Sequence, residues 1–354
     1  HQGMYGDFYE TAIFNHILSA QHPEHGGYVY FTSARPRHYR NYSAPNKAMW
    51  CCVGTGMEDH GKYGQFIWTH DKGMKTEDDA LYVNLFVASE LNWKERKMVL
   101  RQQTAFPYAE TSNIEVTKGK GVFTLKIRKP LWCDNFTVKG VGFVVDCYEE
   151  NGFVCIKRKW KKGDQVEISM PMHASIKPMI NVPQYVAIMY GPILLGMKSG
   201  TEDMRSLIAD DSRFGQYAAG MKLPLDKAPI LLPKHLNDIA KDLKPIPDKP
   251  LHFKLATHME NVINGELQPF FEIHDSRYMM YWLALGENDY KAYMQKLADE
   301  EKARQALEAR TVDKVSPGEQ QPETDHRMET DDSSKGNTEG IFFRDAEDGH
   351  YFCY

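Results

Sequence analysis

Several features that would assign this chain to a familiar class of protein are missing from its sequence. No hydrophobic run reaches about 18 residues, the length at which a helix can cross a bilayer. No long run of Lys or Arg occurs, and 43 basic against 48 acidic residues leave a formal charge of −5. That balance argues against a nucleic-acid-binding surface. The sequence therefore predicts no membrane span and no nucleic-acid partner.

Cysteine is scarce as well. The 354 residues contain six cysteines, and apart from the adjacent pair Cys51 and Cys52 they are scattered. This pattern does not resemble a disulfide framework. The His-Glu-x-x-His motif is also absent, which disfavours a zinc-dependent lyase or peptidase.

The residues that are present favour a multidomain protein with an α + β fold. A chain of this length divides into two or three domains, and 42% hydrophobic residues are ample for a sizeable core. Nineteen Tyr and six Trp suit a protein that handles sugars, whose C–H faces stack on aromatic rings. They suit a β-rich core equally well.

Periodicity along the chain predicts four regions. Residues 1–70 contain two amphipathic helices, at about 5–18 and 57–68, which we interpret as the last helices of a larger helical domain. Residues 71–198 contain a series of short strands typical of an antiparallel β-sandwich. Residues 199–312 comprise a Pro-rich connection, a further β unit and a charged helix at 289–310. Residues 313–354 are expected to be a linker and the start of another β-rich module. The missing initial Met and the strand-like end indicate a fragment truncated at both ends.

The pair Cys51 and Cys52 is the most informative local feature. It precedes a Gly-Thr-Gly turn and a helix-like stretch, so a thiolate there would lie near a helix N-terminus, where partial positive charge favours ionised sulfur. That placement suits a metal ligand, a nucleophile, or both. Two alternatives stay open on spacing alone: two buried small apolar residues, or a strained vicinal disulfide.

A basic loop leads to this pair. Its side chains Arg37, His38 and Arg40 could bind a sugar hydroxyl or a carboxylate, since Arg suits planar carboxylate recognition. A solvated loop is the interpretation that the sequence favours.

The same segment resembles the C-terminal part of the catalytic domain of glycoside hydrolase family 127, which contains the β-L-arabinofuranosidases. The resemblance rests on the runs PRHYR at 36–40 and MWCCVGTGMEDHGKYG at 49–64. Residues 5–19 and HPEHGGY at 22–28 fit the approach to the cysteine pair. Further along, NVPQYVAIMYGPILL at 181–195 is similar to the β region that follows the catalytic barrel in these enzymes.

This resemblance implies the last helices of an (α/α)6 barrel followed by antiparallel β-sandwich domains. It also implies a zinc site of one glutamate and three cysteines, in which Cys51 is both ligand and nucleophile and Cys52 is a ligand. The nucleophile would form a thioglycosyl intermediate, and a glutamic acid would protonate the leaving oxygen and then activate water, so that configuration is retained. Tyr28 and Tyr30 lie where a substrate-binding tyrosine is expected, although ordinary strand packing is the favoured alternative for both.

The sequence departs from the family pattern in one respect. No cysteine precedes Cys51, and nothing before it supplies the Glu-x-Cys ligands or an assigned acid/base glutamate. We therefore expect half of a zinc site, and little or no activity in this fragment alone.

The leading hypothesis is a retaining glycoside hydrolase that acts on β-L-arabinofuranosides or related plant-polysaccharide sugars. By resemblance it would work in the periplasm or outside a bacterial cell. The alternative from another class is a non-catalytic carbohydrate-binding or structural β-sandwich protein in which the cysteine pair is inert.

Overall fold

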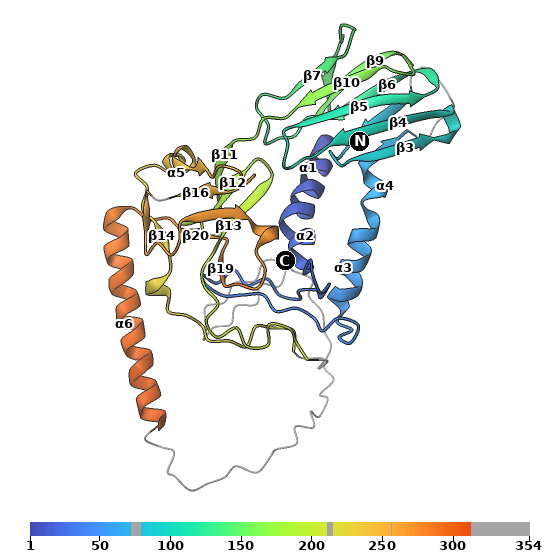
Figure 1. The fold of residues 1–354 in the computed structure, drawn as a ribbon. Coiled ribbons are helices and arrows are strands. Elements are labelled where there is room, and N and C mark those ends of the chain that lie inside the picture. The colour runs from blue at the N-terminus through green and yellow to red at the C-terminus, as the bar shows by residue number, and fades with distance from the viewer. Residues whose placement is uncertain (72–78, 211–214, 256, 313–354) are drawn as a thin grey trace, which may run out of the picture.

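The computed structural model describes residues 1–71, 79–210, 215–255 and 257–312. They form a helical segment, a first β unit of two sheets and a second β unit built on one larger sheet (Figure 1). The linker and β-rich module expected at 313–354 lie outside the described residues. Within the described residues, every helix is too short or too polar to cross a membrane.

The helical segment consists of two stretches separated by a long loop. The first stretch contains α1 (Gly3–Ala12), the π-helical turn η1 (Ile13–Ile17) and α2 (Leu18–Ala20), and the second contains α3 (Cys51–Lys62) and α4 (Gly64–Ile67). The second helix was expected to begin near residue 57, but α3 begins at Cys51 itself. The expectation failed because Gly54 and Gly56 were interpreted as a turn, whereas both adopt helical geometry.

The first β unit holds two five-stranded sheets. Their strand orders are β1-β2-β6-β9-β8 and β3-β4-β5-β10-β7. All pairings within them are antiparallel except β2 with β6, which is parallel and departs from the antiparallel arrangement that was expected. The ten strands are β1 (Trp68–His70), β2 (Ala80–Val83), β3 (Ser89–Trp93), β4 (Met98–Thr104), β5 (Thr111–Lys118), β6 (Lys120–Arg128), β7 (Thr137–Gly140), β8 (Tyr148–Glu150), β9 (Phe153–Lys161) and β10 (Gln165–Ser169). A single-turn helix, η2 (Lys94–Arg96), joins β3 to β4.

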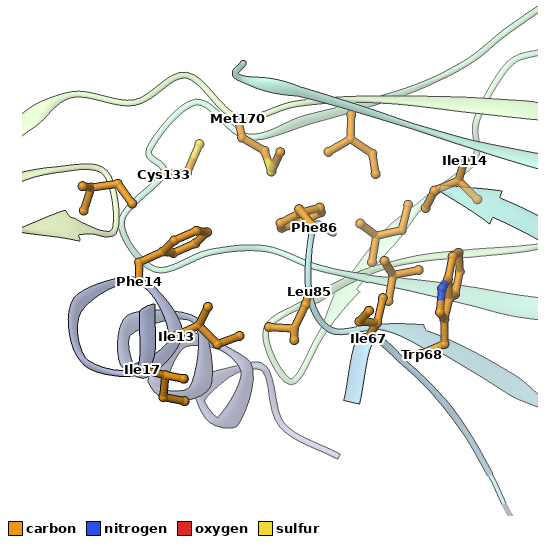
Figure 2. Close-up of a cluster of buried hydrophobic side chains, with 14 of the residues drawn as sticks. Ile13, Phe14, Ile17, Ile67, Trp68, Leu85, Phe86, Ile114, Cys133 and Met170 are labelled. Atoms are coloured by element: carbon orange, nitrogen blue, oxygen red, sulfur yellow. The ribbon is translucent and has the colours of Figure 1, made fainter. Parts of the chain in front are cut away.

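One continuous core joins these sheets to the first helical stretch. Figure 2 shows Ile13, Phe14 and Ile17 of η1 directed toward Leu85 and Phe86, which follow β2. The same core contains buried residues of both five-stranded sheets, such as Leu125 of β6 and Leu100 of β4. The apolar side chains of η1 therefore share one core with the β unit, and the two are expected to stabilise one another.

The second β unit contains residues on both sides of position 198, where the sequence predicted the end of a domain. Its eight-stranded sheet has the order β11-β12-β13-β18-β16-β15, with β19 beside β13 and β20 beside β12. The strands are β11 (Ala174–Pro178), β12 (Tyr185–Tyr190), β13 (Ile193–Lys198), β15 (Lys244–Pro245), β16 (Phe253–Lys254), β18 (Glu266–Pro269), β19 (Tyr278–Met279) and β20 (Trp282–Leu283). Strands that precede residue 198 thus pair with strands that follow the Pro-rich region.

Shorter elements complete this unit. They are the small sheet of β14 (Ile230–Leu231) and β17 (Met259–Glu260), the turns η3 (Leu225–Lys227) and η4 (Phe270–Glu272), and the helices α5 (Leu236–Asp242) and α6 (Glu287–Val312). Helix α6 matches the charged helix predicted at 289–310 and extends away from the sheet (Figure 1).

A buried arginine fastens α1 to the first β unit. Arg128, at the end of β6, has no exposed surface and donates hydrogen bonds to the Asp7 carboxylate at 2.7 Å, to the Glu10 carboxylate and to the Asn84 carbonyl. Trp132 donates to the other Glu10 oxygen at 2.8 Å. Each charge is therefore paired, which buried charges require.

We expect Arg128→Ala to lower the free energy of unfolding by about 3–5 kcal/mol, because it leaves two carboxylates without their cation in a buried site. Chemical denaturation would measure the change. Arg101→Ala is the matched control, since Arg101 pairs with Glu90 where both side chains are about half exposed, and its cost should be about 1 kcal/mol or less. Equal effects of the two substitutions would contradict this account.

Candidate active site at the cysteine pair

Cys51 and Cys52 occupy the first two positions of α3. The preceding residue, Trp50, has the extended backbone of a helix-capping position, and its side chain makes no capping hydrogen bond. The Val53 amide donates to the Trp50 carbonyl at 3.0 Å and closes the first turn. The cysteines therefore lie at the positive end of the helix dipole, as the sequence predicted.

The two sulfurs occupy different environments. Cys51 is exposed, whereas Cys52 is partly buried against a small apolar cluster of Ala44, Ala48, Trp50 and Ala209. Burial, and to a lesser extent the charge of a neighbouring Cys51 thiolate, raise the pKa of Cys52 to about 11. Both cysteines are free thiols, so the vicinal disulfide considered from sequence is not formed. Cys51 is thus the accessible sulfur of the pair.

Of the two predicted tyrosines, Tyr30 lies beside Cys51. The Cys51 sulfur is 4.0 Å from the Tyr30 hydroxyl, with the thiol as donor. The Tyr30 ring lies edge-on to Trp50, with centroids 6.2 Å apart. A thiolate at Cys51 would instead accept from this hydroxyl, because ionised sulfur has no proton to donate.

Tyr28 lies against the next turn of α3. Only 6% of it is exposed, and a Cβ placed on Gly56 would meet its ring at 2.5 Å. Its amide donates to Ser43 Oγ at 2.9 Å, and burial raises the pKa of its hydroxyl. These contacts make Tyr28 a support for α3, whereas the alternative considered from sequence was ordinary strand packing, and a role of Tyr28 in substrate binding stays a prediction.

The loop that leads to the pair is buried, contrary to the solvated loop that the sequence favoured. Arg40 is 2% exposed, donates to the carbonyls of Ser19 and Ile273, and lies 4.5 Å from the centroid of the Phe270 ring. Arg277 donates to the Arg37 carbonyl at 2.8 Å. The partners Ile273 and Arg277 belong to the second β unit, more than 200 residues away. No local pattern in the sequence shows them, which is why a solvated loop was expected.

A cluster of histidines that the sequence did not reveal anchors the start of this loop. His22 Nε2 donates to Asp275 Oδ2 at 2.9 Å, and the Tyr42 hydroxyl donates to His274 Nδ1 at 2.7 Å. Burial, and then the nearby charge of Arg40, lower the pKa of His274 to about 4. Neutral His274 can therefore accept from Tyr42 at physiological pH. No local signal links residues 22 and 274, and only the fold brings them together.

The donors present match zinc in type and not in number. Two adjacent thiols are typical zinc ligands, but a zinc site generally needs four donors, and among the described residues no group of three or more His, Cys, Asp or Glu side chains is placed to hold a metal. Glu58, the nearest carboxylate in sequence, is exposed and pairs with Lys62 at 2.9 Å. The described residues therefore supply at most half of such a site.

Comparison with known sequences identifies the region around the cysteine pair. Residues 1–65 match the profile of the β-L-arabinofuranosidase GH127 catalytic domain, and residues 80–172 match that of the GH127 middle domain. Two further profiles, both of unknown function, match residues 175–284 and 306–354. A search of curated protein sequences gives no match.

Solved structures share the fold. They include a GH127 β-arabinofuranosidase (19% identity, TM-score 0.55), a GH127 β-L-arabinofuranosidase from Geobacillus stearothermophilus T6 (20%, 0.53) and a glycoside hydrolase (18%, 0.52). Each comparison covers 80% of this chain but 46%, 47% and 49% of the respective neighbour. The chain therefore spans about half the length of the proteins it resembles.

The contact between Tyr28 and α3 predicts different outcomes for two nearby glycines. Gly56→Ala should lower stability by about 1–3 kcal/mol, because its Cβ would overlap the Tyr28 ring. Gly54→Ala meets no atom within 4 Å and should stabilise the helix by about 0.5–1 kcal/mol. Thermal or chemical denaturation would compare them. If both variants unfold like the wild type, Tyr28 does not support α3.

The raised pKa of Cys52 predicts slow alkylation. At pH 8 a thiol with a pKa of about 11 is about one-thousandth ionised, and the thiolate is the reactive form. With metal removed, iodoacetamide and peptide mapping by mass spectrometry should find Cys51 modified well before Cys52. Cys52 should stay slow in Cys51→Ser, since burial is the larger cause of its shift. Exposed Cys147 is the internal reference. If Cys52 is alkylated as fast as Cys147, its pKa is not raised and the assignment is refuted.

Proposed function

The chain belongs to glycoside hydrolase family 127, and on that premise we propose that the whole protein is a retaining glycosidase of β-L-arabinofuranosides or related plant-polysaccharide sugars. Cys51 is its nucleophile. The observation that carries the proposal is the position of Cys51, whose exposed sulfur lies at the first residue of α3 beside the Tyr30 hydroxyl.

The proposed reaction uses sulfur in two displacements. The Cys51 sulfur attacks the anomeric carbon, so that a C–S bond forms as the glycosidic C–O bond breaks and the leaving oxygen takes a proton from a carboxylic acid. Water, deprotonated by the same carboxylate, then displaces the sulfur. Two inversions retain the configuration. The acid/base glutamate would come from a part of the protein outside this chain.

Within this scheme the chain's own residues hold and orient the sulfur. The N-terminus of α3 favours negative charge at Cys51, and the Tyr30 hydroxyl would donate to the thiolate and restrict its direction. Cys51 and Cys52 would both hold zinc, together with a glutamate and a cysteine from outside the chain. Bound zinc would keep the thiols ionised near neutral pH, which the pKa of Cys52 otherwise opposes.

Exposed apolar side chains on the helices are consistent with a barrel of which this chain supplies only a part. Met4, Tyr5 and Phe8 of α1 are 57%, 62% and 76% exposed, Met57 of α3 is 54% exposed, and α3 has no buried residue. Large apolar side chains gathered on a surface generally mark a face that another element covers. We therefore propose that these helices complete an (α/α)6 barrel, with the first β unit as a β-sandwich behind it. A periplasmic or extracellular location in a bacterium remains part of this proposal.

The decisive experiment uses the full-length protein with cysteine variants. Cys51→Ser should lose hydrolysis of 4-nitrophenyl β-L-arabinofuranoside by about a thousandfold or more, since a nucleophile is removed. Zinc content, measured by mass spectrometry of the metal, should fall in both Cys51→Ser and Cys52→Ser. Cys147→Ser is the matched control and should keep zinc and activity. Wild-type hydrolysis by Cys51→Ser would overturn the nucleophile, and a protein without zinc or hydrolysis would favour a binding module.

A further inference from the structure

An open cleft lies between the first and second β units, with a volume of about 400 Å³. One wall is the segment that joins β4 to β5, around Tyr108 and Glu110, and the other is the segment around Asp248 and His252 beside β16. Its lining shares no residue with the surroundings of Cys51. The cleft is therefore a separate feature of the molecule, of a size that suits a small ligand.

An exposed aromatic ring with a fixed hydroxyl stands at the edge of this cleft. Tyr108 is 51% exposed, and its hydroxyl donates to Glu272 Oε1 at 2.6 Å. The other Glu272 oxygen lies 3.7 Å from His252 Nε2. Inside the cleft, the rings of Tyr190 and Phe253 lie 4.7 Å apart. The ring of Tyr108 is thus held in place by its hydroxyl while about half of its surface stays open to a ligand.

The polar side chains that line the cleft include two carboxylates, Glu110 and Asp248, beside one lysine, one histidine and two tyrosine hydroxyls. Glu110 Oε1 accepts from the Met172 amide at 3.1 Å and from the Tyr190 hydroxyl at 3.4 Å, which fixes this side chain. Asp248 is exposed on the opposite wall, and Lys249 pairs with Glu266 at 3.0 Å. This charge pattern disfavours an anionic ligand. It suits hydroxyl groups, because a carboxylate accepts strong hydrogen bonds from them.

We propose that the cleft binds a neutral oligosaccharide chain, with a sugar ring stacked on Tyr108 and its hydroxyls donating to Glu110 and Asp248. Sugars combine an apolar C–H face with donors at the ring edge, and the cleft presents surfaces for both. Such a site would bind a polysaccharide at a place separate from Cys51. It goes beyond the proposed hydrolysis and does not depend on it.

The test is affinity electrophoresis of the full-length protein through gels that contain arabinan, arabinoxylan or xyloglucan. At least one polymer should retard the wild type and Cys51→Ser equally. Tyr108→Ala should weaken binding about tenfold, because it removes the aromatic ring on which the sugar stacks. Tyr148→Ala is the matched control, because Tyr148 is also 51% exposed but lies on β8, outside the cleft.

A second variant guards against a folding defect in Tyr108→Ala. Asp248 has a positive φ of 60°, which Asn tolerates, so Asp248→Asn should fold normally and weaken binding about threefold by removing a charged acceptor. Hydrolysis of the small aryl glycoside should be unchanged in both cleft variants. No retardation of the wild type by any of the three polymers, or equal retardation of Tyr108→Ala and Tyr148→Ala, would overturn the proposal.

Discussion

The buried cluster around Arg128 joins α1, the first helix of the helical segment, to the first β unit. Its guanidinium reaches Asp7 and Glu10 of α1 and the carbonyl of Asn84. Packing alone tolerates sliding of a helix over a sheet, whereas a planar guanidinium with fixed donors accepts one register. A Cβ at Gly6 would meet the Arg128 side chain at 2.4 Å, so the close approach of α1 itself depends on a residue without a side chain. The apolar contacts of η1 in Figure 2 then follow from that register.

Two other buried arginines fix the path between α2 and α3. Arg40 binds the carbonyls of Ser19 and Ile273, and Arg277 binds those of Arg37, Glu202, Asp203 and Met221. A long loop without regular structure carries many backbone carbonyls that must find donors when they are buried. Arginine supplies several donors from one side chain, and backbone pairs add to these contacts with the second β unit, such as the Tyr42 amide with the Leu207 carbonyl and the Tyr278 amide with the His38 carbonyl. The position of Cys51 therefore depends on residues from the far end of the chain.

Local patterns in the sequence predicted the strands well where burial alternates, as in β5 and β10, and predicted α6 from its charged amphipathic period. They failed where a contact is distant. Asp7 lies 121 residues from Arg128, and Arg40 lies 233 from Ile273, so no window on the sequence shows that these cations are buried. For the same reason the expected boundary at 198 did not reveal that β13 pairs with β18. At the site, the cysteine pair was recognisable from its neighbours, whereas the separate environments of its two sulfurs and the support from Tyr28 needed the fold.

The strand order of the second β unit has a consequence for how the protein is made. Strand β13 pairs with β12 immediately before it, but its other edge is covered by β18 and β19, whose paired residues lie between 72 and 82 positions later in the chain. A ribosome that releases the chain from its N-terminus exposes that edge, with the apolar side chains of Leu195 and Met197, until residue 279 has emerged. Unpaired edges of this kind favour association with other chains. The residues between 199 and 265 must therefore be synthesised before this edge of β13 can be covered. An insertion among them would lengthen the time during which the edge is unpaired.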